Sequence, residues 1–300
     1  MYTRFTITNV STYIYLLKEV IFVTLYSAII FILYEYFEHR HISLAFSISA
    51  IMGTAIAILL GFRTSAAYDR WWEARKIWGG IVNDSRTLIR QSLGFIAPGG
   101  NKDQEVKRLT KYQIAWCYAL STSLRKLPIS KEVKKNLSEE DFEYVNKHIN
   151  IPNAILKLME DQLSLLFRQG KIDSYHFAVM DQTLKHLCDH MGKSERIKST
   201  VFPVHYGFFI KMSIIIFALL LPLEVVEFLG IFTIPVTFAV IIFISVIESI
   251  ANYLQDPFEN RAADISMTTI CRTIEINLLQ MDGVKDVPDI MQPDKNGIFM

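Results

Sequence analysis

The chain has 300 residues, of which 51% are apolar, and its 31 basic and 30 acidic residues leave a formal net charge of +1. This balance supplies no bulk electrostatic attraction for nucleic acid or for acidic partners. The three cysteines, Cys117, Cys188 and Cys271, are too far apart in sequence for a CxxC metal site or a disulfide framework. These features exclude a nucleic-acid-binding protein and a disulfide-rich secreted domain.

Long apolar runs occupy the two ends of the chain. A helix that crosses a bilayer needs about 20 mostly apolar residues. Four runs approach or reach this length: Val20–Tyr34, Ile42–Phe62, Tyr206–Leu223 and Ile231–Ile247. Lys211 interrupts the third run near one end, from which its long side chain can reach the interface. Four such runs are too many for the core of a soluble protein of this size, so the sequence predicts a multi-pass membrane protein with four transmembrane helices.

Lysine and arginine residues are distributed unevenly around these runs. The two short connections, 35–41 and 224–230, contain Arg40 as their single strongly basic residue, whereas the tails and the middle of the chain hold almost all the others. Cytoplasmic segments of membrane proteins carry this excess of positive charge. The sequence therefore predicts that both termini and the middle region lie in the cytoplasm and that the two short connections face outward.

The middle region, residues 63–205, reads as amphipathic helices separated by turn signals. Apolar residues recur at steps of three and four, which is typical of a helix with one buried face. One such stripe comprises Leu109, Tyr112, Trp116, Leu120, Leu124 and Leu127. A further helix is expected over Asp173–Arg196 and another over 262–280, and no stretch alternates with the period of a strand. The sequence thus predicts an all-α protein divided into 1–62, 63–205, 206–253 and 254–300.

A polar, aromatic segment follows the second apolar run directly and reads Gly61-Phe62-Arg63-Thr64-Ser65-Ala66-Ala67-Tyr68-Asp69-Arg70-Trp71-Trp72-Glu73-Ala74-Arg75. Taken alone, it is typical of an interfacial belt of aromatic and basic anchors. Two further motifs lie near the end of the chain, Asp256-Pro257-Phe258 and Ile274-Glu275-Ile276-Asn277-Leu278-Leu279-Gln280-Met281. Together these motifs, and the order of spans, insertion and tail, resemble the bestrophin family, especially its bacterial members. The signature residues are Arg63, Tyr68, Arg70, Trp71, Glu73, Arg75, Asp256, Pro257 and Phe258.

The resemblance implies a homopentameric ion channel in the lipid bilayer of a bacterial inner (plasma) membrane. Its central pore is narrowed to a hydrophobic neck by the second helix. The positions that match this neck are Thr54, Ile58 and Phe62. Their spacing of four places them on one face of a helix, and rings of apolar side chains can gate a pore by dewetting. Thr54 departs from the apolar residue expected there and predicts a wetter outer ring. The alternative is that this face packs on a neighbouring helix.

The resemblance also concerns two further features of the family, a second constriction and a calcium site, of which this sequence matches only the first. A second constriction in the cytoplasmic vestibule is expected at Leu187, counted back from Glu195-Arg196. The calcium clasp of eukaryotic members follows the Pro-Phe pair, but here Glu259 replaces the expected glycine and Arg261 interrupts the acidic run. Calcium needs six to eight oxygen ligands, so the sequence argues against calcium activation and predicts no cofactor.

Several polar residues allow other interpretations. His186 and His190 are four apart on an expected helix, a spacing that can place two imidazoles on one metal or in a titratable vestibule ring, and that also suits a plain helix surface. Glu248 and Asn252 lie at the end of the fourth apolar run, where an ionisable residue marks either a functional site or a polar helix interface.

These observations leave three hypotheses for function. The first is a passive channel for small monovalent ions, with chloride as the family's default and a monovalent cation channel as the alternative, because nothing in the neck is charged. The second is a membrane-bound metalloenzyme using His186 and His190, although the chain lacks the usual multiple histidine motifs. The third is a non-conducting membrane scaffold. We favour the channel and expect no enzymatic activity.

Overall fold

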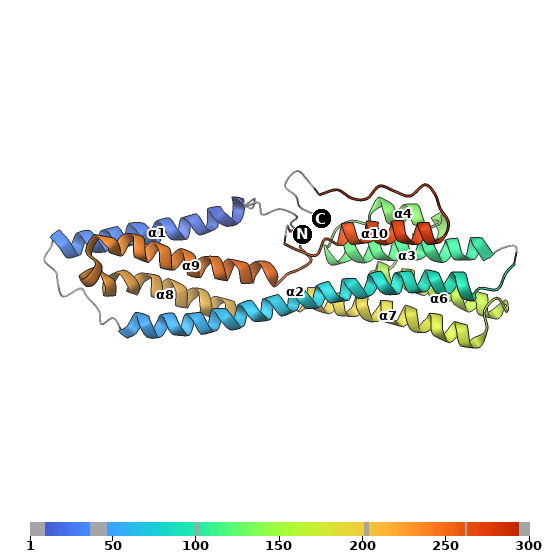
Figure 1. Ribbon diagram of the computed structural model, residues 1–300, viewed down its shortest axis with the longest axis horizontal. Coiled ribbons are helices and arrows are strands. Elements are labelled where there is room, and N and C mark those ends of the chain that lie inside the picture. Colours follow the sequence, from blue (N-terminus) through green and yellow to red (C-terminus); the bar gives the residue numbers. More distant parts are fainter. Residues whose placement is uncertain (1–9, 37–46, 100–101, 201–203, 262, 294–300) are drawn as a thin grey trace. The chain divides into compact units, whose positions relative to one another are not determined.

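The computed structural model describes residues 10–36, 47–99, 102–200, 204–261 and 263–293. These ranges contain helices and connecting turns (Figure 1), which confirms the all-α prediction. The chain forms two compact units. The apolar unit comprises Ile7–Trp71 and Val201–Gln255, and the polar unit comprises Trp72–Thr200 and the chain from Asp256 onward, each in its described part.

The apolar unit contains α1 (Val10–Tyr36), the first part of α2 (Ser47–Phe95), α8 (Val204–Leu229) and α9 (Thr233–Leu254). The helix α1 packs on both α8 and α9. A short 3₁₀ turn, η2 (Gly230–Phe232), reverses the chain between α8 and α9. Its first residue has φ 51°, a conformation that glycine adopts without steric cost. Residues 48–95 and 205–254, the latter including the α8–α9 hairpin, are long and apolar enough to cross a membrane, and Val20–Tyr36 is a shorter apolar helix.

The helix α2 is much longer than the predicted span at Ile42–Phe62. It begins at Ser47 within the described residues, and continues for 49 residues to Phe95. No proline interrupts it, and buried residues recur mostly at steps of three, four or seven, which keeps them on one face. The first part of α2 belongs to the apolar unit and the second part to the polar unit, so the structure divides the chain after Trp71 and not after Phe62.

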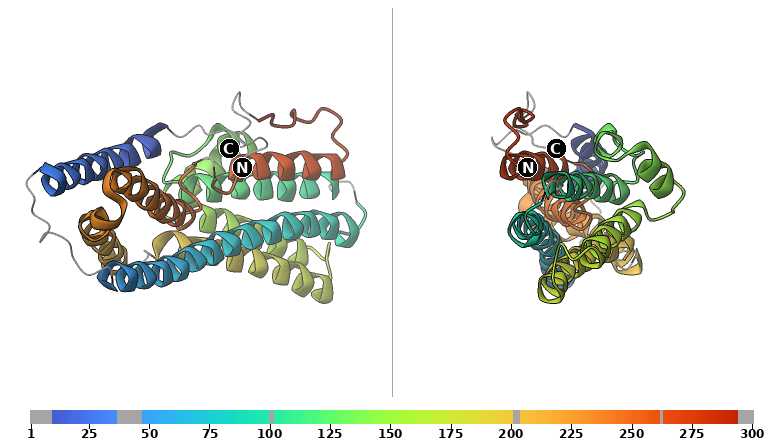
Figure 2. Two further views of the ribbon diagram at one scale, coloured as in Figure 1. Left: turned by 60° about the vertical axis from the view of Figure 1, so that its left-hand side comes forward. Right: turned by 90° about the vertical axis from the view of Figure 1, so that its right-hand side faces the viewer.

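The polar unit is built around α3 (Lys102–Leu124), which contacts α4 (Lys131–Asn136), α6 (Ile151–Arg168), α7 (Ser174–Ser199) and α10 (Met267–Met281). Figure 2 shows α10 and α3 side by side. A shorter helix, α5 (Glu139–Asn146), packs on α6. The predicted stripe on α3 is buried from Leu109 to Leu124, but Leu127 is exposed because the helix ends at Leu124 and Lys126 turns the chain with φ 54°.

Side-chain caps fix where several of these helices begin. Asp173 accepts a hydrogen bond from the backbone N–H of His176, and Asn150 and Ser138 cap α6 and α5 in the same way. Such caps satisfy N–H groups that have no partner within the helix. The predicted C-terminal helix at 262–280 starts later, at Met267, because the preceding loop closes on itself through a bond from the N–H of Ile265 to the carbonyl of Pro257.

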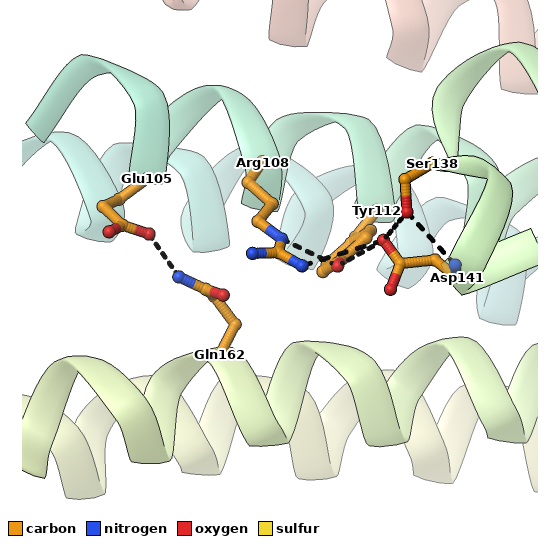
Figure 3. Close-up of polar contacts among 6 residues, drawn as sticks. All are labelled: Glu105, Arg108, Tyr112, Ser138, Asp141 and Gln162. Atoms are coloured by element: carbon orange, nitrogen blue, oxygen red, sulfur yellow. Dashed lines mark hydrogen bonds and ion pairs between the residues drawn. The ribbon is translucent and has the colours of Figure 1, made fainter. Parts of the chain in front are cut away.

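A polar strip on α3 links it to two other helices (Figure 3). The guanidinium of Arg108 donates to the Tyr112 hydroxyl at 2.8 Å, and this hydroxyl donates to Asp141 on α5 at 2.9 Å. Burial raises the pKa of Tyr112 to about 12, so the phenol remains a donor at neutral pH. The amide of Gln162 on α6 reaches Glu105 in the same strip. These contacts fix the orientation of α5 and α6 on α3.

Two carboxyl groups meet between α6 and α7 and predict a pH effect. Burial and the hydrogen-bonded Asp181 raise the pKa of Glu160. The folded state therefore binds this proton more tightly than the unfolded state, and stability falls as pH rises through the raised pKa. We expect Glu160→Gln, which mimics the protonated acid, to raise the melting temperature at pH 7 and to have little effect at pH 4. An equal gain from Glu143→Gln, on the exposed surface of α5, would contradict this assignment.

Candidate functional site: the exposed stripe of helix α2

One face of α2 in the apolar unit is not covered by the other described residues of that unit. Ile58 is 55% exposed and Phe62 is 69% exposed, and Thr54 lies on the same face. Ile56 and Leu60, on the opposite face, are buried against the apolar unit. Positions four apart share a helix face, so these three side chains form a continuous stripe. The Thr54 hydroxyl donates to the carbonyl of Ala50 at 2.9 Å, within its own helix.

The residue after Phe62 points the other way, into the apolar unit. Arg63 is buried, and its guanidinium contacts Glu248 at 3.2 Å and Asn252 at 2.5 Å on α9. The Asn252 amide also donates to Glu248, at 2.8 Å. Gly207 on α8 leaves room for this group, because a Cβ there would lie 3.3 Å from Arg63 Nη2. The structure thus joins a signature residue to the two polar candidates of α9, a link that no sequence pattern had indicated.

Two further signature residues of the apolar unit organise the end of α9. Arg70 donates from Nε to the carbonyl of Gln255 at 2.6 Å, directly after α9 ends. The carbonyls of the last helical turn have no partner within a helix, so this bond caps α9. Tyr68 and Trp71 form a tilted ring pair with centroids 6.1 Å apart. These residues follow the stripe along α2 and shape the part of the apolar unit where α9 ends.

In the polar unit, the signature continues on the second part of α2. Glu73 accepts from Arg196 on α7 at 2.7 Å, and Arg75 lies half-buried on the same helix. Both members of the ion pair are well exposed, and exposed pairs contribute about 0–1 kcal/mol. This contact therefore orients α7 more than it stabilises the unit.

The Asp256-Pro257-Phe258 motif forms the start of a closed loop before α10. Pro257 and Phe258 are buried, and Asp256 is half-buried. Asp264 accepts from the backbone N–H of Arg261 at 2.8 Å, inside the same loop. The motif therefore shapes the connection from α9 to α10 by packing and internal hydrogen bonds.

The acidic groups of this loop have protein partners. Glu259 accepts from Lys198 on α7 at 2.5 Å, and this ammonium lowers the pKa of the carboxyl. Burial raises the pKa of Asp264. Within the described ranges, no group of three or more His, Cys, Asp or Glu residues is placed to hold a metal ion.

The proposed lower constriction at Leu187 is wrong. Its side chain is 0% exposed and lies on the buried face of α7, inside the polar unit. A side chain filling the core of its own subunit cannot narrow a shared pathway. The count back from Glu195-Arg196 therefore placed the constriction on the buried face of the helix. Among the large side chains of α7, Tyr175 in the first turn is 72% exposed.

The two histidines of α7 do not share a site. His190 is partly buried, and its Nε2 lies 3.0 Å from Asp84 on α2. His186 is exposed and contacts Gln182 on its own helix. The metal interpretation has no supporting geometry, and His190 instead joins α7 to α2.

The close approach of His190 to α2 predicts opposite effects for two adjacent glycines. A Cβ at Gly80 would lie 2.5 Å from His190 Cε1, whereas a Cβ at Gly79 would meet nothing within 4 Å. We expect Gly80→Ala to lower the free energy of unfolding by about 1–3 kcal/mol through overpacking. Gly79→Ala should raise it by roughly 0.5–1 kcal/mol, since alanine is the better helix former. Thermal unfolding of both variants measures the difference, and equal gains would show that His190 does not occupy this position.

Comparison with known proteins shows the family to which the chain belongs. The family described as Bacterial/Fungal Bestrophin protein matches residues 2–280 of the chain. The chain belongs to the bacterial and fungal bestrophin family. This confirms the resemblance inferred from the three motifs.

Relatives and solved structures agree with this assignment. The chain is 30% identical to the voltage-dependent anion channel-forming protein YneE of Escherichia coli K12, over 90% of this chain and 87% of YneE. It is 32% identical to the voltage-dependent anion channel-forming protein alr2987 of Nostoc, over 77% and 75% of the two chains. A crystal structure of a bacterial bestrophin homologue from Klebsiella pneumoniae matches with a TM-score of 0.85 and 31% identity, covering 90% of this chain and 99% of that one. Bestrophins of this group are membrane proteins, and the relatives are named as anion channels and not as enzymes.

Proposed function

We propose that this bestrophin is a homopentameric channel in which five copies of α2 surround a central pore. The observation that carries the proposal is the exposed stripe of Thr54, Ile58 and Phe62 on a helix whose opposite face, with Ile56 and Leu60, is packed. Contiguous apolar surface of this kind marks an interaction site or a pathway. Five copies of Ile58 and Phe62 would form two apolar rings, which pass ions by size and hydration and close by dewetting.

The topology that fits this pore has four membrane passes. The helices α1, α8 and α9 and the first part of α2 each supply one pass, and both termini and the polar unit lie in the cytoplasm of a plasma (inner) membrane. Support comes from the apolar stretches at 48–95 and 205–254 and from the excess of Lys and Arg outside the short connections. Four passes are too few to enclose a pathway within one chain, which favours a shared pore in an oligomer.

The permeant ions are small and monovalent, and we assign chloride as the main one, because relatives of this chain are named as anion channels. The neck does not discriminate between anions and cations, because the stripe carries no charge. Arg63, which follows the stripe in sequence, is paired with Glu248. Charges elsewhere on the pathway must therefore select for anions.

The reversal potential of the purified protein in a planar bilayer under a KCl gradient tests this function. A shift toward the chloride equilibrium potential is the expected result. A shift toward the potassium potential would replace the anion assignment with a cation channel of the same architecture. No current from the unmodified protein or from variants with a widened neck would contradict the channel and favour a scaffold.

A further inference from the structure

We infer that two carboxylates, the fully buried Glu224 and the partly buried Glu248, are positioning residues that hold the neck segment of α2 at both ends and set its rotation. This inference rests on the proposed pore for its functional meaning, but its structural content can be tested separately. Both carboxylates belong to the α8–α9 hairpin, and both bind groups of α2 that flank the stripe.

The first contact is at the beginning of α2. Glu224 of α8 is fully buried, and both of its carboxylate oxygens accept from the backbone N–H of Ser49 at 3.0 Å. The first N–H groups of a helix have no partner within the helix, and the N-terminus carries a partial positive charge that favours an anion. Glu224 therefore acts as a cap supplied by a different helix, and it fixes α2 at this end relative to α8.

The second contact is at the other end of the stripe. Arg63 extends from α2 to Glu248 and Asn252 on α9, and those two residues bond to each other. A charged side chain within an apolar helical unit is costly unless it is paired. Ser49 and Arg63 are 14 residues apart, which corresponds to about 21 Å along a helix. The positions Thr54 to Phe62 lie between the two contacts.

Apolar packing alone does not specify the rotation of α2. Ile56 and Leu60 pack on the apolar unit, but such contacts are non-directional. Between helices in a membrane they also lack the hydrophobic driving force that operates in water. Hydrogen bonds and ion pairs depend on direction, and charge-assisted ones most strongly. The two carboxylates therefore determine which face of α2 packs inward and which face remains as the stripe.

One further contact has the same effect. The Tyr206 hydroxyl of α8 donates to the carbonyl of Leu59 at 3.2 Å, on the side of α2 that faces the hairpin. Leu59 lies between Ser49 and Arg63, the two residues of α2 that the carboxylates contact. The α8–α9 hairpin thus makes polar contacts with α2 at three points, Ser49, Leu59 and Arg63. None of these contacts involves the side chains of the stripe.

Spin labels placed singly along 54–62 test the inference without depending on ion conduction. Label mobility reports which face of a helix is packed, whether the open face meets water or lipid. The exposed Cys188 is first replaced by serine, and Cys117 and Cys271 are buried. One labelled subunit is assembled with an excess of unlabelled subunits, so that labels do not crowd one another in the proposed neck. Labels at 58 and 62 should then be more mobile than labels at 56 and 60.

The decisive variants are Glu224→Leu and Glu248→Leu. They keep a side chain of similar volume but remove the carboxylate oxygens that accept from Ser49 and Arg63. We expect the mobile positions to move off 58 and 62 while the helical periodicity persists. Glu248→Gln, which retains an acceptor for Arg63, should restore the native pattern. Glu227→Leu is the matched control, because Glu227 is exposed on the same helix as Glu224.

Two outcomes would overturn the inference. An unchanged pattern in both leucine variants would show that packing alone orients α2. A uniform rise in mobility at all positions would show a general structural role with no effect on rotation. If a leucine variant does not assemble, Arg63→Lys, which shortens the contact and keeps the charge, supplies the same comparison. Failure of the proposed pore would appear differently, as a native mobility pattern in a protein whose current is insensitive to Phe62.

Discussion

Replacing Phe62 by alanine is expected to increase the chloride current severalfold. Phe62 is the largest side chain of the stripe and is 69% exposed in the subunit. If five copies face one another, their removal widens the neck and allows water to remain in it, which lowers the barrier from dewetting. Because the side chain makes few contacts within the subunit, the fold should be retained. Single-channel recording in a planar bilayer measures the change.

A matched control separates a pore effect from a general loss of apolar surface. Phe243 on α9 is 67% exposed, almost the same as Phe62, but does not lie on the α2 stripe. Phe243→Ala should leave the single-channel conductance unchanged. Equal effects of the two substitutions would place the pathway somewhere other than along α2.

Replacing Glu275 by alanine is expected to cause the largest loss of stability in the polar unit. Glu275 is buried on α10, accepts from the Tyr118 hydroxyl on α3 at 2.8 Å, and lies 3.5 Å from the Arg272 guanidinium. Burial and the adjacent carboxylate raise the pKa of Tyr118, so the phenol stays protonated and donates. Removing one member of a buried charged group leaves the others unsatisfied and costs about 3–5 kcal/mol.

The expected shift in melting temperature is roughly 10 °C for a chain of this size, measured by thermal unfolding in detergent. Glu275→Gln is the informative comparison, because it keeps an acceptor for Tyr118 and loses only the charge. Its cost should be smaller, about 1–2 kcal/mol. If both variants unfold at the native temperature, α10 does not depend on this network for its packing on α3.

Local sequence patterns predicted the helices of this protein well where one physical signal dominated. The stripe from Leu109 to Leu124 placed α3, because each of its apolar positions had to be buried on one face. Asp173 marked the start of α7, since its carboxylate caps the helix. The pattern did not predict that α2 would continue to Phe95, because a change from apolar to polar residues ends a membrane pass but does not end a helix.

The candidate site also contains residues whose exposure fits the sequence prediction and one whose burial contradicts it. The family resemblance, supported by a spacing of four residues, grouped Thr54, Ile58 and Phe62, and the structure leaves all three side chains exposed. Counting back along α7 misplaced Leu187, because exposure depends on which face meets α3 and α6, and no motif near that residue records it.

By itself, the sequence determined that this is an all-helical membrane protein of the bestrophin family, because apolar runs and short motifs depend only on neighbours along the chain. Only the tertiary structure decided which polar groups meet. Arg63 is 185 residues from Glu248, and Ser49 is 175 residues from Glu224. An ion pair or a cap between distant helices depends on their packing and rotation, which no local periodicity encodes, and these contacts are the ones that orient the stripe.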